Sequence, residues 1–185
     1  MSKTSSPIDH AFKRCSLLSR VIQFEYERAR ANPLDQRNVE LGIFDLGEKV
    51  EKKEAQDRIE EAFSEVVALS NHLAILDMAA ALEYFFRARV GTAIGEARKT
   101  LNKKHGRTLA GRTRLIRDVD EFEGLSEIVK LIDSNLSREV QDLLEKVREN
   151  RNRFAHGTDI KNPPTILREE ARGALIEAAT LLQPV

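Results

Sequence analysis

The chain has 185 residues, with 30 basic residues balanced by 30 acidic ones, and it is 41% hydrophobic, 32% charged and 5% aromatic. This length and balance are typical of one soluble domain with its own core and exclude a disordered chain. The shortage of aromatic residues disfavours a β-sandwich. The single cysteine, Cys15, excludes an internal disulfide and favours a reducing compartment.

Helical periodicity dominates the first half of the chain. Apolar residues at helical spacing predict a helix over residues 8–31, which Pro33 ends before a connector rich in turn residues. A second helical region is expected over about 49–98, with Ser70 as a candidate break. Its part from 73 to 90 is apolar almost all round, which indicates a central buried helix.

The second half is predicted to hold three further helices. They are expected at about 126–136, at 138–155 and from about Thr165, where Glu169 and Glu170 suit a first turn. No alternating strand pattern occurs in the sequence. The chain is therefore predicted to be a single all-α domain spanning residues 1–185.

The basic residues are concentrated in one segment. Eight basic and no acidic residues lie between Arg98 and Arg117, a charge run that can follow a phosphate backbone or form a solvated loop. A DNA-binding protein is disfavoured because no helix-turn-helix signature accompanies the run. The candidate RNA-binding residues are Lys103, Lys104, Arg107, Arg112 and Arg114.

The stretch RENRNRFAHG (residues 148–157) places a charge on an apolar stripe. Arg151 lies in line with Val147 and Phe154, because positions 140, 144, 147, 151 and 154 follow helical spacing. A guanidinium there must be paired or must line a cleft. Basic residues followed by glycine also suit an ordinary helix end, so a purely structural reading stays open.

Two other features bear on cofactors and location. His10, His72 and His105 have no metal-ligand spacing, and no phosphate-binding glycine loop occurs, so no metal or cofactor is implied. The N-terminus lacks the order of a signal peptide, and no clean run of about 20 apolar residues occurs. A cytoplasmic protein without a membrane span is expected.

The motif RNRFAH (Arg151 to His156) resembles the R-x4-6-H motif of HEPN domains, and residues 148–157 within a helical C-terminal half resemble the RiboL-PSP-type groups. The segment AILDMAAALEYFF, with Glu83 among apolar neighbours, is similar to their central helix. The resemblance covers a core of about 60–182 and leaves about 8–50 as an N-terminal helical extension.

This resemblance implies an antiparallel bundle of about five helices and a homodimer in which two motif copies meet in a cleft. It further implies a metal-independent endoribonuclease, such as a toxin or an anti-phage, abortive-infection effector acting on tRNA or mRNA, with an antitoxin protein as partner. One subgroup carries a tyrosine two positions after the motif histidine that is modified with AMP. Thr158 stands there in this chain.

The residue types suit RNA cleavage by the RNA's own 2′-OH. His156 can transfer protons near neutral pH, Arg151 can bind phosphate oxygens, and Asn152 can orient the imidazole or bind phosphate. Glu83 is expected to pair with Arg151 or to orient the site. Arg148 and Arg153 are either substrate contacts or surface charges. The alternative function is a non-catalytic HEPN-like RNA-binding or adaptor module.

Overall fold

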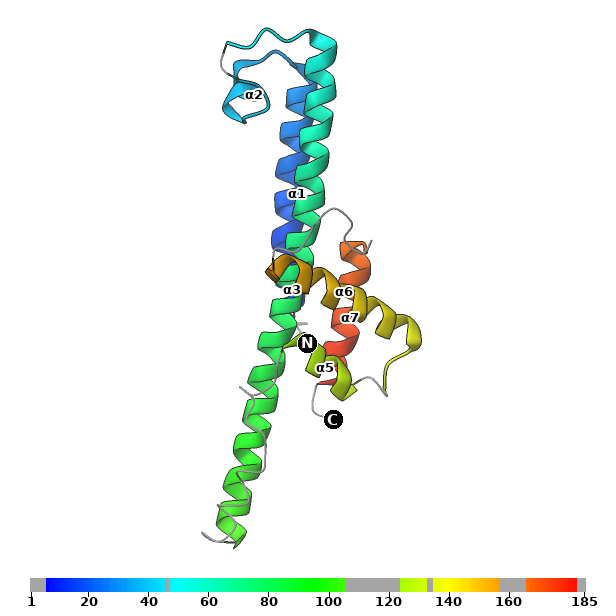
Figure 1. Cartoon of the computed structure of the whole chain (residues 1–185). Coiled ribbons are helices and arrows are strands. Elements are labelled where there is room, and N and C mark those ends of the chain that lie inside the picture. Colours follow the sequence, from blue (N-terminus) through cyan, green and yellow to red (C-terminus); the bar gives the residue numbers. More distant parts are fainter. Residues whose placement is uncertain (1–5, 46, 106–123, 133–134, 157–165, 183–185) are drawn as a thin grey trace, which may run out of the picture. The chain divides into compact units, whose positions relative to one another are not determined.

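A computed structural model describes residues 6–45, 47–105, 124–132, 135–156 and 166–182, and Figure 1 shows their arrangement along the chain. Helices and short turns make up these residues, and no strand occurs among them. The predicted all-α class is confirmed. The helices are α1 (Pro7–Ala31), α2 (Gln36–Glu40), α3 (Lys52–His105), α5 (Leu125–Ile132), α6 (Arg138–His156) and α7 (Arg168–Leu181).

Two helix boundaries differ from those expected. Helix α3 continues through Ser70, where a break was a candidate, because a single serine among residues with good helix propensity costs little. Helix α2 lies in the segment expected to be a connector. Its N-cap is Asp35, whose carboxylate accepts a hydrogen bond from the Arg37 N–H at 3.0 Å.

The chain divides into two compact units, whereas the sequence predicted one domain with a core from about residue 60. Unit 1 comprises Met1–Phe12 and Ile75–Val185, and unit 2 comprises Lys13–Ala74. Helices α1 and α3 each contribute to both units, so the boundary falls within two helices. In α3 the boundary lies close to residue 73, where the sequence becomes apolar almost all round, but in α1 no composition shift marks it.

Unit 1 has the larger core. Ile75, Met78, Ala79 and Leu82 of α3 are each 0% exposed, which agrees with the central buried helix expected here. They pack with residues of the α1 N-terminus, α5, α6 and α7: Ile8, Ala11, Leu125, Ile132, Leu144, Val147, Ala171, Ala174, Leu175, Ala178 and Ala179. An ion pair also joins α1 to α7, with Arg172 Nε donating to Asp9 Oδ1 at 3.0 Å.

Unit 2 contains long segments of α1 and α3, with α2 in the turn between them, and it has a small core near one end. Its buried apolar cluster contains Ala29, Phe44, Ala55 and Ile59. The rings of Tyr26 in α1 and Phe63 in α3 pack against it, with centroids 5.4 Å apart. Arg30 Nε and Glu60 Oε1 lie 4.0 Å apart, close to the Tyr26–Phe63 contact along the helix pair. These contacts show that the two helices run antiparallel within this unit.

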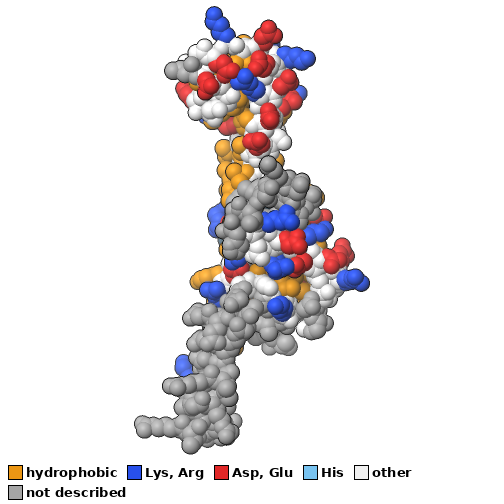
Figure 2. All heavy atoms as spheres, in the orientation of Figure 1, with side chains coloured by type: hydrophobic (Ala, Val, Ile, Leu, Met, Phe, Trp, Pro, Cys, Tyr) orange, Lys and Arg blue, Asp and Glu red, His pale blue; other side chains and the backbone are white. Residues whose placement is uncertain are grey.

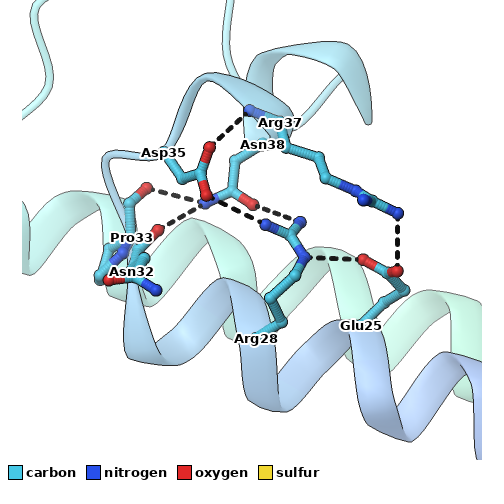
Figure 3. A network of polar contacts seen from close by, with 7 residues as sticks. All are labelled: Glu25, Arg28, Asn32, Pro33, Asp35, Arg37 and Asn38. Atoms are coloured by element: carbon cyan, nitrogen blue, oxygen red, sulfur yellow. Dashed lines mark hydrogen bonds and ion pairs between the residues drawn. The ribbon is translucent and has the colours of Figure 1, made fainter.

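A polar network closes the turn after α1 (Figure 3). The Asn38 side chain is fully buried, and its Nδ2 donates to the backbone oxygens of Asn32 at 3.1 Å and Pro33 at 2.9 Å. Its Oδ1 accepts from Arg28 Nη2 at 3.3 Å. Both polar ends of a buried amide are therefore satisfied, which fixes the turn and α2 against α1.

Candidate functional site

Arg151 lies where the apolar stripe of α6 predicts it. Leu144 and Val147 are fully buried and are followed on the same side of the helix by Arg151, whose side chain is 33% exposed. The stripe thus leaves the core of unit 1 one turn before the end of α6. The aliphatic part of Arg151 can extend from the core while its guanidinium reaches solvent.

Two polar side chains hold the Arg151 guanidinium. Its Nη2 lies 3.5 Å from Oε1 of Glu83, and its Nη1 donates to Oδ1 of Asn152 at 3.2 Å. The Glu83 side chain is only 16% exposed. Of the site residues predicted from sequence, these three are brought together by the fold.

Glu83 has a closer partner than Arg151. Its Oε1 accepts a hydrogen bond of 2.9 Å from the backbone N–H of Leu125, the first residue of α5. A carboxylate at the start of a helix accepts a hydrogen bond from a backbone N–H that has no partner within the helix. Its negative charge is also stabilised by the positive end of the helix dipole. Glu83 therefore fixes the start of α5 and attracts the Arg151 guanidinium with the same oxygen.

Gly124 makes this arrangement sterically feasible. Its φ is +69°, a conformation that L side chains rarely adopt, and a Cβ at this position would lie 3.1 Å from Glu83 Oε1 and 3.6 Å from Arg151 Nη2. Glycine thus lets the backbone turn into α5 next to the carboxylate. Sequence reasoning did not single out Gly124, although its place directly before an apolar helix was a visible signal.

The position of His156 is known from the backbone. Helix α6 extends through His156 as its last residue, and the histidine side chain lies outside the described residues. His156 follows Arg151 by five positions, which corresponds to roughly 7.5 Å along an α-helix and about 140° around it. The two motif residues therefore share one helix end on different sides of α6.

Arg148 is engaged within its own helix. Its Nε donates to Glu145 Oε2 at 2.8 Å, and its Nη2 contacts Glu145 Oε1. The hydrogen bonds from Arg148 lower the pKa of Glu145, and those to Glu145 raise the pKa of Arg148. The pair lines a hollow of about 450 Å³ whose other lining residues are Ser126, Val129, Lys130, Gln141 and Asp142. Arg153 is half-buried.

Much of the predicted RNA-binding segment lies outside the described residues. Lys103 and Lys104 belong to the last turn of α3, but their side chains are not described. Arg107, Arg112 and Arg114 fall in 106–123, and Thr158 falls in 157–165, both outside the described ranges. The expectation of a phosphate-binding surface at 98–117 therefore stays a prediction.

Asn150 is a buried polar residue that sequence reasoning missed. It is 2% exposed and lies on α6 one residue before Arg151. Its spacing of three from Val147 was the available signal, because it places Asn150 beside the core-facing side of the helix. A buried amide at this point adds a second polar group where α6 leaves the core.

The described residues contain no group of three or more His, Cys, Asp or Glu side chains that could hold a metal ion. Comparison with family models, with curated proteins and with solved structures finds no match for this chain. The arrangement of the site residues offers a permanently charged, partly exposed guanidinium, held by a carboxylate and an amide, at the helix end that carries a histidine.

Proposed function

We propose that the protein is a metal-independent endoribonuclease of the HEPN type, with Arg151, Asn152 and His156 as its catalytic residues. The observation that carries the proposal is the combination of contacts and solvent exposure at the Arg151 guanidinium. Its guanidinium lies 3.5 Å from Glu83 and 3.2 Å from Asn152 and remains one-third exposed. A cation serving only to neutralise the half-buried Glu83 carboxylate has no need for this access to solvent.

The length of the Glu83 contact supports anion binding. A contact of 3.5 Å is longer than the 2.7–2.9 Å that is typical of a strong charge-assisted hydrogen bond. Glu83 is satisfied more closely by the Leu125 N–H at 2.9 Å. Phosphate oxygens can therefore compete for the fork of Arg151 without leaving Glu83 unpaired.

The chemistry assigned to the site needs no nucleophile from the protein. The 2′-OH of the RNA attacks the adjacent phosphorus, its proton passes to a base, and the 5′-oxygen leaves with a proton from an acid. The products are a 2′,3′-cyclic phosphate and a 5′-hydroxyl. His156 transfers protons near neutral pH, while Arg151 stabilises the charge on the pentacoordinate phosphorus.

A homodimer completes this proposal. Two copies that meet at the ends of their α6 helices would supply two His156 side chains, one as base and one as acid. The biological setting proposed with it is a cytoplasmic toxin or anti-phage, abortive-infection effector, with tRNA or mRNA as substrate and an antitoxin as protein partner. The basic segment would add affinity through phosphate contacts.

A non-catalytic RNA-binding or adaptor module is the second candidate. It is favoured by the role of Glu83, which holds both Arg151 and the start of α5 and so gives Arg151 a structural function. The two candidates differ in what His156 does. An adaptor has no chemical requirement for a histidine at the end of α6.

The test is cleavage of end-labelled tRNA and total RNA by purified protein in EDTA. We expect products with a 2′,3′-cyclic phosphate, and His156→Ala should lower the rate at least about 100-fold. His10→Ala, which changes an exposed histidine at the other end of the chain, is the matched control and should cleave normally. Full activity of His156→Ala, or 3′-hydroxyl products formed only with a divalent metal, would exclude the proposed mechanism.

Arg151→Lys tests the fork separately from the charge. Lysine keeps the positive charge but cannot bind two phosphate oxygens in a plane, so cleavage should fall strongly while the protein stays folded. Arg138→Lys, at the exposed start of α6, is the control. An adaptor would bind RNA equally well in all of these variants and cleave it in none, wild type included.

A further inference from the structure

Unit 2 exposes large apolar side chains along both of its helices. On α1, Leu17, Leu18, Val21 and Phe24 are 45–66% exposed, and on α3, Val66, Leu69 and Leu73 are 41–44% exposed. Figure 2 shows hydrophobic side chains gathered along the visible side of this helix pair. These seven residues are called the apolar face of unit 2.

The antiparallel register brings the two rows to the same levels. The Tyr26–Phe63 ring contact and the Arg30–Glu60 pair each join residues whose numbers add to 89 or 90. The same sum places Val21 level with Leu69. Leu17 is likewise level with Leu73, and Phe24 with Val66. The exposed apolar residues therefore occupy one common stretch of the helix pair.

This stretch has almost no interior of its own. Ser70 is the only buried residue among residues 13–24 of α1 and 60–73 of α3. The apolar core of unit 2 lies nearer the turn, at Ala29, Phe44, Ala55 and Ile59. Two helices cannot enclose apolar side chains without a further layer, so the face lacks a covering element within unit 2.

The size of the face fits a protein partner. The seven large apolar side chains are each 41–66% exposed along one stretch. A monomer rarely exposes more than a few hundred Å² of apolar surface in one patch, and a standard interface buries about 800 Å² per partner. One helix pair of equal length is enough to cover it. A second copy of this chain supplies such a pair.

The charges at the two ends of the α1 row favour a second copy in antiparallel orientation. Lys13 and Arg14 precede the row. Beyond its other end, α1 carries Glu25 and Glu27 beside Arg28 and Arg30, and Glu25 is paired with Arg28 and Arg37. The net acidic charge at this end comes from α3, where Glu60, Glu61 and Glu65 are exposed at the same levels. Parallel pairing would bring like charges together at both ends, whereas antiparallel pairing brings the basic end of each copy to the acidic end of the other. The surface is thus complementary to itself after a two-fold rotation.

We infer that the apolar face of unit 2 is a self-association surface, on which the helix pair of a second copy packs antiparallel to form a four-helix arrangement. In α1, Leu18 and Val21 then face the partner's Val21 and Leu18 across the two-fold axis. This inference does not rest on the proposed ribonuclease function. An interface at α6 would be a separate surface, and a chain with both would form assemblies of more than two copies.

A membrane is the competing occupant. Within Lys52–Ala93 of α3, one 18-residue window has a mean hydropathy of 1.4 and is 33% buried, so its length and composition would allow it to cross a bilayer. However, α3 contributes Ile75, Met78, Ala79 and Leu82 to the core of unit 1 at 0% exposure. These four apolar residues of α3 are therefore already covered by protein.

The first experiment measures the mass of the full chain in solution by light scattering up to about 100 µM. We expect wild type to exceed the 21.0 kDa of one chain, and Leu17→Gln/Val21→Gln to halve the measured mass, with unchanged helicity by circular dichroism. Leu34→Gln/Leu41→Gln replaces two leucines of unit 2 that are equally exposed but lie in the turn region, and should leave the mass unchanged. A wild-type mass of one chain at every concentration overturns the inference.

Vesicle flotation with neutral and anionic lipids runs in parallel. If the chain floats, and Leu17→Gln/Val21→Gln stops flotation without changing the mass, the face binds lipid and self-association is overturned. Absence of flotation together with a halved mass supports the second copy.

The orientation is tested with spin labels on cysteines introduced in a Cys15→Ser background. Antiparallel pairing centred between Leu18 and Val21 places two labels at Lys13 about 18 Å further apart along the axis than two labels at Arg20, at 1.5 Å per residue. Parallel pairing gives equal distances at both sites. Equal distances would overturn the antiparallel arrangement.

Discussion

Two neighbouring segments of helix α3 have similar apolar content and opposite surroundings. In residues 75–86, Ile75, Met78, Leu82 and Phe86 are at most 1% exposed, whereas in residues 66–73 the large apolar side chains remain more than 40% exposed. The difference lies in what packs against each segment. The first is covered by α5, α6, α7 and the start of α1, and the second has only α1.

This comparison shows that an apolar run predicts a helix with partners but does not say how many partners its own chain supplies. Unit 1 surrounds its part of α3 and can position polar groups such as Glu83 at the edge of a packed core. Unit 2 holds its helices together at the turn and leaves the remaining apolar surface exposed. The candidate site lies in the first environment and the self-association surface in the second.

The largest expected effect separates the two segments directly. Leu82→Ala should lower the free energy of unfolding by about 3 kcal/mol, because it leaves a cavity in the core of unit 1. Leu69→Ala removes the same atoms from a side chain that is 44% exposed and should cost less than about 1 kcal/mol in dilute solution. Urea denaturation followed by circular dichroism measures both, and equal losses would contradict the comparison.

The second prediction concerns what stabilises unit 2. Asn38→Ala removes the amide that bonds the oxygens of Asn32 and Pro33, and should cost about 2 kcal/mol locally because buried polar groups lose their partner. Hydrogen exchange at the Ile43 amide, which donates to the Asn38 carbonyl, should become faster. Gln36→Ala, at an exposed position of the same helix, is the control. Unchanged exchange in Asn38→Ala would show that the small apolar cluster alone holds the turn.

The sequence predicted the fold class and the start or end of most helices, because 3.6-residue periodicity and proline are local signals. It also placed Arg151 in line with the apolar stripe of α6 and near Glu83, 68 positions earlier in the chain. The division into two units was not predictable in the same way. It depends on where the helices that pack against α3 end, and the residues of α3 do not determine this.

Gly124 could have been noticed as the residue before an apolar helix, but its contact with Glu83 and the bond from Leu125 could not be predicted. The bond from the Leu125 N–H to Glu83 depends on the entry angle of α5 and on a φ of +69° at Gly124. Buried polar residues such as Asn38 and Asn150 look like surface residues in a sequence, because asparagine is usually exposed. For Asn150 the spacing of three from Val147 was a weak signal, whereas the burial of Asn38 depends on the turn that its own side chain bonds.

A smaller effect is expected at the ion pair within unit 1. The hydrogen bonds from Arg172 to Asp9 lower the pKa of that carboxyl group below its usual value, so the pair stabilises the folded state above the unfolded pKa of about 3.9. Asp9→Asn should cost about 1 kcal/mol at neutral pH, since both side chains are partly exposed. As the pH falls through the folded pKa, wild type loses this contribution and the two proteins should converge. Asp57→Asn, an exposed acid of unit 2, should show no such pH dependence.

The smallest effect is expected at the corresponding ion pair in unit 2. Arg30 and Glu60 are 4.0 Å apart with side chains 62% and 55% exposed, and water and salt screen a pair of this kind almost completely. Glu60→Gln should therefore change the free energy of unfolding by less than about 0.5 kcal/mol. Thermal melts at low and at 0.5 M salt, with Asp9→Asn in the same series, give the measurement. A cost for Glu60→Gln that equals the cost of Asp9→Asn would mean that exposure does not separate the two pairs. The antiparallel contact of α1 with α3 would then owe more to charge than to the rings of Tyr26 and Phe63.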